Sequence, residues 1–129
     1  MKILVTGSAG FIGYHLVNKL TNNIKNTIIG IDSVNSYYST KIKKLRIMIL
    51  KKKKNFSFKK INLENKKRLD TVVKKFQPDI VFHIAGQPGV LYSFKDPLSY
   101  KKNNIVATEN LSLICKKYKI KKFIFASSS

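Results

Sequence analysis

Acidic residues are scarce in this chain, since six Asp and Glu stand against 26 Lys and Arg and the formal net charge is +20. A single cysteine, Cys115, excludes an internal disulfide framework and is typical of a reducing compartment. No apolar run approaches the roughly 18 residues of a membrane span. We therefore expect a cytoplasmic protein with no membrane partner, and the sequence shows no ligand cluster that would predict a metal site.

The excess of positive charge has two interpretations. Binding to nucleic acid is the obvious functional one. However, only two of the 26 basic residues are Arg, which binds phosphate groups better than Lys because its guanidinium can donate two hydrogen bonds at once. Lys, Asn and Ile together make up 51 of the 129 residues. This composition is typical of A/T-rich codons, and the lysines are spread along the chain. We therefore expect no specific nucleic-acid partner, only a non-specific attraction that fades with salt.

The first thirteen residues organise the chain. An apolar run, Ile3 to Val5, leads into three glycines, Gly7, Gly10 and Gly13, and then into a segment with helical periodicity. This order predicts a strand, a tight turn and a helix. Glycines let the backbone approach a ligand closely, and the first N–H groups of a helix lack intrahelical partners. The stretch therefore predicts a cradle for an anionic pyrophosphate.

A second predicted strand ends in Asp32, nineteen positions beyond Gly13. In a dinucleotide fold, an acid at this position accepts hydrogen bonds from the adenosine ribose, and its charge repels a 2′-phosphate. Taken alone, Asp32 could be a simple turn former at a strand end. Together with the glycines it favours NAD over NADP.

Strands and helices alternate along the rest of the chain. We expect helices over 11–22, 41–51, 65–76 and 97–118, and strands over 56–61, 80–84 and 122–126. This alternation predicts an α/β fold: a Rossmann-type parallel sheet of strand order 3-2-1-4-5, forming one NAD-binding domain over 1–129 that is incomplete at its C-terminal side. Ligands bind such sheets at the carboxyl ends of the strands. Residues expected there are Gly7, Asp32, Asn62, Ala85, Gly86 and Ser128.

Two residues whose side chains could take part in catalysis are expected to be structural instead. His83 interrupts the apolar strand 80–84, and no acidic or thiol residue stands at a fixed spacing from it. A hydrogen-bonded core histidine is therefore favoured over a catalyst. Cys115 lies between apolar neighbours on a predicted helix, which favours a core thiol over a nucleophile.

A set of motifs carries a family resemblance. They are Thr6-Gly7-x-x-Gly10-Phe11-Ile12-Gly13, Asp32, Asn62-Leu63, His83-Ile84-Ala85-Gly86-Gln87, Asn104 with Asn110, and the Ser run 127–129. Together they resemble the extended short-chain dehydrogenase/reductase family of NAD-dependent nucleotide-sugar epimerases and dehydratases. Within the family, the sequence looks most like UDP-glucuronate 4-epimerases because of two further motifs, Asn35-x-Tyr37-Tyr38 and Gln87-x-Gly89-Val90-x-Tyr92-Ser93.

The resemblance implies that NAD takes a hydride from C4 of a UDP-sugar and returns it to the other face. It also implies roles for residues: Gly7, Gly10, Phe11, Ile12 and Gly13 at the pyrophosphate, Asp32 at the ribose, Asn62 and Leu63 at the adenine, Ala85, Gly86 and Asn104 on the nicotinamide side, Gln87 and Ser93 at the substrate, and Ser128 as the catalytic residue at the sugar hydroxyl. Family members commonly dimerise, and the helix 97–118 would take part.

The sequence departs from the family pattern at several positions. Asn62 replaces a common Asp, Ser33 replaces a common Asn, and Leu91 stands where glucuronate epimerases carry an Arg that can pair with a carboxylate. The family's catalytic Tyr-x-x-x-Lys follows the fifth strand, and the sequence stops at Ser129. Tyr37–Lys41 and Tyr118–Lys122 have the spacing at positions that should not reach the nicotinamide.

We therefore expect the truncated, NAD-binding N-terminal part of a nucleotide-sugar 4-epimerase, inactive alone. The alternatives are a non-catalytic NAD- or nucleotide-binding module and the corresponding part of a nucleotide-sugar 4,6-dehydratase.

Overall fold

The computed structural model describes residues 1–127. Its strands are β1 (Lys2–Thr6), β2 (Thr27–Asp32), β3 (Phe56–Lys60), β4 (Ile80–His83) and β5 (Lys122–Phe125). Its helices are α1 (Phe11–Leu20), α2 (Thr40–Lys51), α3 (Lys66–Phe76), α4 (Val90–Ser93), α5 (Pro97–Tyr100), the π-helix η1 (Lys101–Val106) and α6 (Ala107–Lys117).

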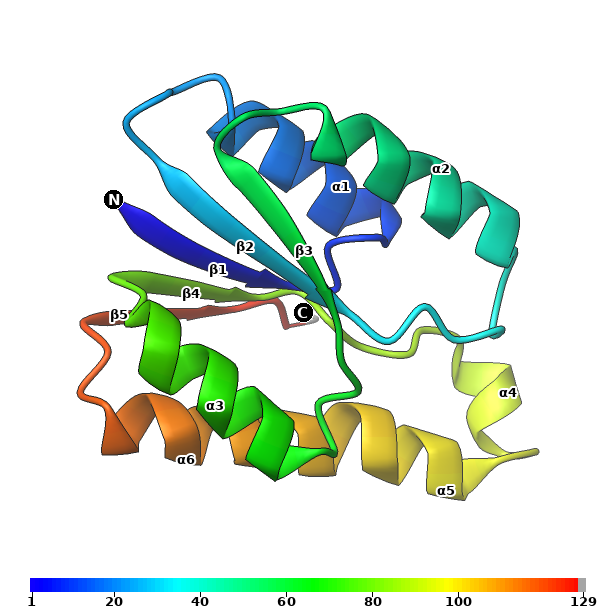
Figure 1. Ribbon diagram of the computed structural model, residues 1–129. Helices are drawn as coiled ribbons and strands as arrows, with labels where there is room; N and C mark the ends of the chain where they lie inside the picture. Colours follow the sequence, from blue (N-terminus) through cyan, green and yellow to red (C-terminus); the bar gives the residue numbers. More distant parts are fainter. Residues whose placement is uncertain (128–129) are drawn as a thin grey trace.

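The five strands form one sheet in the order β3-β2-β1-β4-β5, and every neighbouring pair is parallel. The predicted fold class and strand order are thus confirmed. Helices α1 and α2 cover one face of the sheet, and α3 and α6 cover the other (Figure 1). All five strands consequently end at the same edge, as the sequence analysis expects.

The core has two halves, one on each face of the sheet. In β1, Ile3 and Val5 point into the half that contains Val17 of α1, whereas Leu4 points into the half that contains Leu111 of α6. These side chains are fully buried, so the central strand is apolar on both faces. A run without polar alternation is what a parallel strand covered by helices on both sides requires.

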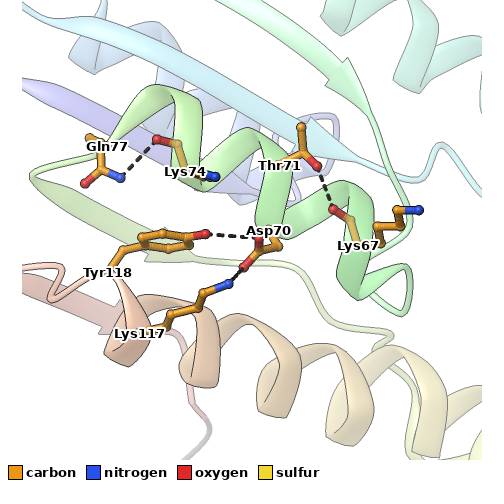
Figure 2. A network of polar contacts seen from close by, with 7 residues as sticks. All are labelled: Lys67, Asp70, Thr71, Lys74, Gln77, Lys117 and Tyr118. Carbon is orange, nitrogen blue, oxygen red and sulfur yellow. Dashed lines mark hydrogen bonds and ion pairs between the residues drawn. The ribbon is translucent and has the colours of Figure 1, made fainter.

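A polar network joins α3 to the end of α6 on the surface (Figure 2). Asp70 accepts hydrogen bonds from Lys117 Nζ at 2.8 Å and from the Tyr118 hydroxyl at 3.0 Å. The bond from Lys117 is the main reason that the pKa of Asp70 lies below its ordinary value.

Cys115 of α6 is buried, and burial raises the pKa of its thiol to about 11, which confirms the predicted core thiol.

The prediction of one continuous helix over 97–118 is wrong. The segment is divided into α5, η1 and α6, and α6 ends at Lys117. In a π-helix each turn holds an extra residue, so side chains change their direction relative to an α-helix. The short helix α4 was not predicted, and the ends of the other elements differ from the predicted ones by no more than two residues.

Helix α2 carries more apolar residues than it buries. Ile47 and Leu50 pack into the core, whereas Ile42, Leu45 and Met48 are each about half exposed. Within residues 1–127, no helix is long and apolar enough to cross a membrane. The same residues contain no group of three or more His, Cys, Asp or Glu arranged to hold a metal ion.

Candidate dinucleotide site

A cavity of about 660 Å³ lies along the carboxyl edge of the sheet. Its lining includes eleven of the predicted site residues: Gly7, Gly10, Phe11, Ile12, Gly13, Asp32, Asn62, Leu63, Ala85, Gly86 and Gln87. Asn104 and Ser93 do not line it, and Ser128 lies outside the described residues. The fold therefore brings residues from four separate segments to one site, while their individual roles stay predictions.

The glycine loop depends on close backbone packing at two positions. Gly7 has a φ of +69°, and a Cβ there would lie 2.7 Å from the backbone nitrogen of Ala85. At Gly13, a Cβ would overlap the carbonyl oxygen of Gly7. The first turn of α1 consequently rests directly on the loop, and the loop rests directly on the segment that follows β4.

Helix α1 presents an uncapped N-terminus to this cavity. Its N-cap residue is Gly10, no side chain caps the helix, and its first turn contains no acidic residue. The first amide groups of a helix have no intrahelical acceptor, and the helix dipole adds partial positive charge there. Phe11, Ile12 and Gly13 form this turn and line the cavity. The arrangement fits the pyrophosphate of a dinucleotide.

Asp32 lies at the end of β2, beside this turn. One carboxylate oxygen accepts the N–H of Ala9 at 3.0 Å, and the other accepts the N–H of Val34 at 2.7 Å. An ionised carboxylate has about four acceptor positions. Two backbone bonds fix its orientation and leave capacity for the two hydroxyls of a ribose.

Two basic residues of α2 also line the cavity, and neither was predicted from the sequence. Lys43 is only 4% exposed, and its ammonium donates to the backbone oxygen and the Oδ1 of Asn35 at 2.9 and 2.7 Å. Burial lowers the pKa of Lys43, and the nearby Asp32 charge opposes this effect. Arg46 donates to the carbonyl of Ala9 and to the Tyr38 hydroxyl, both at 3.2 Å. Nothing in the sequence distinguishes Lys43 from the other 23 lysines, whereas Arg46 could have been noticed because it is one of only two arginines.

The far end of the cavity is built around Gln87. The side chain of Asn104 accepts the Gln87 N–H at 2.7 Å and donates to the Gln87 carbonyl at 3.1 Å. Asn103 donates to the Gln87 side-chain oxygen at 2.8 Å, and the Gln87 amide donates to Ser99 at 3.1 Å. Both asparagines lie on η1, and Asn103 rather than Asn104 lines the cavity. Ser93 instead donates to the carbonyl of Val90 within α4.

His83 lies beneath the cavity and is fully buried. Its Nδ1 is 2.7 Å from the Thr6 hydroxyl, and its Nε2 is 2.8 Å from the Thr108 hydroxyl. Burial lowers the pKa of the imidazole to about 4, so the ring is neutral at pH 7. The predicted hydrogen-bonded core histidine is confirmed.

Neither Tyr-x-x-x-Lys pair is placed at the cavity. The Tyr37 hydroxyl donates to the carbonyl of Pro88 at 2.6 Å, and the Tyr118 hydroxyl donates to Asp70 between α3 and the end of α6 (Figure 2). Neither tyrosine lines the cavity. Both hydroxyls thus have structural partners away from the glycine loop.

Comparison with known proteins identifies the class. The profile described as "NAD dependent epimerase/dehydratase family" matches residues 3–129, and the chain belongs to this family. Protein CapI of Staphylococcus aureus is 43% identical over 129 residues, which are 100% of this chain and 38% of that protein. The UDP-glucuronate 4-epimerase of Thermodesulfobacterium geofontis is 36% identical over 126 residues, which are 98% of this chain and 39% of that protein.

Among solved structures, the UDP-glucuronic acid 4-epimerase of Bacillus cereus, in complex with UDP-glucuronic acid and NAD, superposes with a TM-score of 0.92. It is 38% identical, and the match covers 100% of this chain and 40% of that one. The chain thus spans about 40% of the length of these relatives and corresponds to their N-terminal part.

Proposed function

We propose that the cavity binds NAD, with the pyrophosphate on the first turn of α1, the adenosine ribose at Asp32 and the nicotinamide towards Ala85 and Gly86. The observation that carries the proposal is that one cavity contains a helix N-terminus without a side-chain cap and an oriented carboxylate. The first attracts a diphosphate and the second attracts ribose hydroxyls. The NAD in the Bacillus cereus complex supports the same assignment.

Bound NAD would supply a hydride acceptor for a sugar carbon. This chain contributes binding and orientation: the amides of α1 hold the diphosphate, and the close contact between Gly7 and Ala85 fixes the wall beside the nicotinamide. The charge of Asp32 repels a 2′-phosphate, which favours NAD over NADP. The ammonium of Lys43 is held in place by two hydrogen bonds to Asn35.

For the whole protein to which such a chain contributes, we propose 4-epimerisation of a nucleotide sugar, with residues 1–129 as the NAD-binding domain. The support is the similarity to two UDP-glucuronate 4-epimerases. Leu91 is 82% exposed on α4 and offers no hydrogen bond to a carboxylate, so a uronic acid would need another partner. A nucleotide-sugar 4,6-dehydratase that uses the same NAD site is the alternative.

We also propose a cytoplasmic protein that pairs with a second copy through the segment α5 to α6. Apolar side chains are exposed along it, at Leu98, Ile105 and Leu113. Sedimentation of the chain at rising concentration tests this: a monomer throughout contradicts it. Substituting Ile105 by Lys should shift a dimer towards monomer.

The test of the NAD proposal is calorimetric titration of the 129-residue chain. We expect saturable binding of one NAD per chain, and binding of NADP at least about tenfold weaker because Asp32 faces the 2′-phosphate. A chain that is folded by circular dichroism but gives no saturable heat would overturn the proposal. The same preparation should not epimerise UDP-glucuronic acid, since Tyr37 and Tyr118 are engaged elsewhere.

A further inference from the structure

One continuous chain of hydrogen bonds passes through the buried imidazole of His83. The N–H of Ala85 donates to the Thr6 hydroxyl at 3.2 Å, and this hydroxyl lies 2.7 Å from His83 Nδ1. On the other side, His83 Nε2 lies 2.8 Å from the Thr108 hydroxyl, which donates to the carbonyl of Asn104 at 2.6 Å. The chain therefore connects β1, β4, α6 and η1.

The direction of every bond in this chain follows from counting hydrogens. Thr108 gives its only hydroxyl hydrogen to Asn104, so it must accept one from His83 Nε2. Nδ1 then carries a lone pair and accepts the hydroxyl hydrogen of Thr6, whose oxygen accepts the N–H of Ala85. All five groups are satisfied only by the neutral imidazole with its proton on Nε2.

The hydrogen-bond chain ends at two residues, Ala85 and Asn104, and each of them fixes part of the cavity wall. Ala85 lines the cavity directly and lies against Gly7. Asn104 holds both backbone polar groups of Gln87 with its side chain. The three-residue segment from Ala85 to Gln87 is thus fixed at both ends through one ring.

The imidazole is also enclosed by aromatic side chains of β5. The ring of Phe125 stacks on it with centroids 5.3 Å apart and an interplanar angle of 24°, and the Phe123 centroid lies 6.0 Å away. No water competes for the two ring nitrogens when the ring is fully buried. The two threonines therefore determine which nitrogen carries the proton.

We propose that His83 is a positioning residue of the cofactor site: as the Nε2–H tautomer it links Thr6 to Thr108 and so holds the segment 85–87 in the shape that receives the nicotinamide end of the dinucleotide. This inference rests on the proposed function for the identity of the ligand. A residue that only filled core space would be replaceable by another ring of similar size. A positioning residue requires the acceptor at Nδ1 and the donor at Nε2.

Four substitutions separate these roles. His83→Phe keeps a ring and removes both polar atoms. His83→Asn restores an acceptor at the position of Nδ1, because its Oδ1 is the same number of bonds from Cβ. At the other end, Thr108→Val removes the acceptor for Nε2–H, whereas Thr108→Ser keeps it.

The experiment combines nitrogen-15 NMR of histidine in the 129-residue chain with calorimetric titration of NAD. We expect the Nε2–H tautomer of His83 at pH 7, NAD binding weakened about tenfold or more in His83→Phe and Thr108→Val, and binding within about threefold of wild type in Thr108→Ser. His83→Asn should show an intermediate loss, because it restores the acceptor for Thr6 but not the donor to Thr108. Val73→Ala, which weakens the core beside α3, should leave the affinity of the folded chain unchanged.

An Nδ1–H tautomer, or unchanged NAD affinity in both His83→Phe and Thr108→Val, would overturn the inference. If His83→Phe does not fold, the Thr108 pair and the tautomer still decide. If the wild-type chain binds no NAD, the proposed function fails, while the tautomer still tests the hydrogen-bond chain by itself.

Discussion

The carboxylate of Asp32 accepts a hydrogen bond from the backbone N–H of Ala9 at 3.0 Å, which ties the end of β2 to the glycine loop after β1. The group expected to hold the ribose thus also orients the loop expected to hold the pyrophosphate. A change at Asp32 should therefore affect both halves of the proposed NAD site.

Replacing Asp32 by Asn should weaken NAD binding about 10- to 100-fold, because charged hydrogen bonds contribute about 1.5–3 kcal/mol each. The preference for NAD over NADP should shrink, since the repelling charge is gone. Calorimetry with both dinucleotides measures this. Asp70→Asn is the matched control, because it makes the same chemical change in the surface network of Figure 2. Equal losses in both variants would contradict the assigned role.

Replacing Gly13 by Ala should destabilise the fold by several kcal/mol, because the new Cβ would overlap the carbonyl of Gly7 and backbone must move. Urea unfolding followed by circular dichroism measures the change. Gly86→Ala is the control, since its Cβ would meet only the Asn104 side chain at an ordinary 3.5 Å. Similar unfolding midpoints for the two variants would show that the packing of α1 on the loop is not as tight as described.

The hydroxyls of Tyr37 and Tyr100 both lie 2.6 Å from the carbonyl of Pro88, and so hold the segment before α4 against the loop after β2. Desolvation is the first reason that the pKa of Tyr100 is raised to about 12, with the neighbouring Tyr37 adding to it. Replacing both tyrosines by Phe should speed amide hydrogen exchange over 89–94 while the exchange of β1 stays unchanged. Tyr118→Phe should leave 89–94 unaffected, and equal acceleration in this control would refute the contact.

The stability of the chain should fall between pH 7 and pH 5. His83 has a pKa of about 4 in the fold against an ordinary value of 6.5, so the unfolded chain binds more protons in this window. The contribution of His83 is complete above pH 6.5 and decreases towards pH 4, with a loss of about 2 kcal/mol from pH 7 to pH 5. Denaturant unfolding at both pH values measures it. His83→Asn should flatten the slope, and an unchanged slope would rule out a buried neutral imidazole.

The features that the sequence predicted are those carried by local pattern. Gly7, Gly13 and Asp32 follow short apolar strands, and strand ends meet at one edge in any parallel sheet. Lys43 could not be predicted, because a helix in a lysine-rich chain gives no sign of which lysine turns back to the sheet, whereas Arg46 was distinguishable as one of only two arginines. The η1 segment was missed because a one-residue shift in backbone hydrogen bonding leaves no mark on composition.

The most direct test of the account is a proton–nitrogen correlation spectrum of the 129-residue chain, recorded with increasing NAD at about 150 mM salt, where exposed charges are screened over about 8 Å. We expect the largest saturable shifts at the amides of Phe11, Ile12 and Gly13, and further shifts at Ala85 and Gly86. Shifts that instead centre on the exposed lysines beside Asp70, with no change in the first turn of α1, would contradict the central claim.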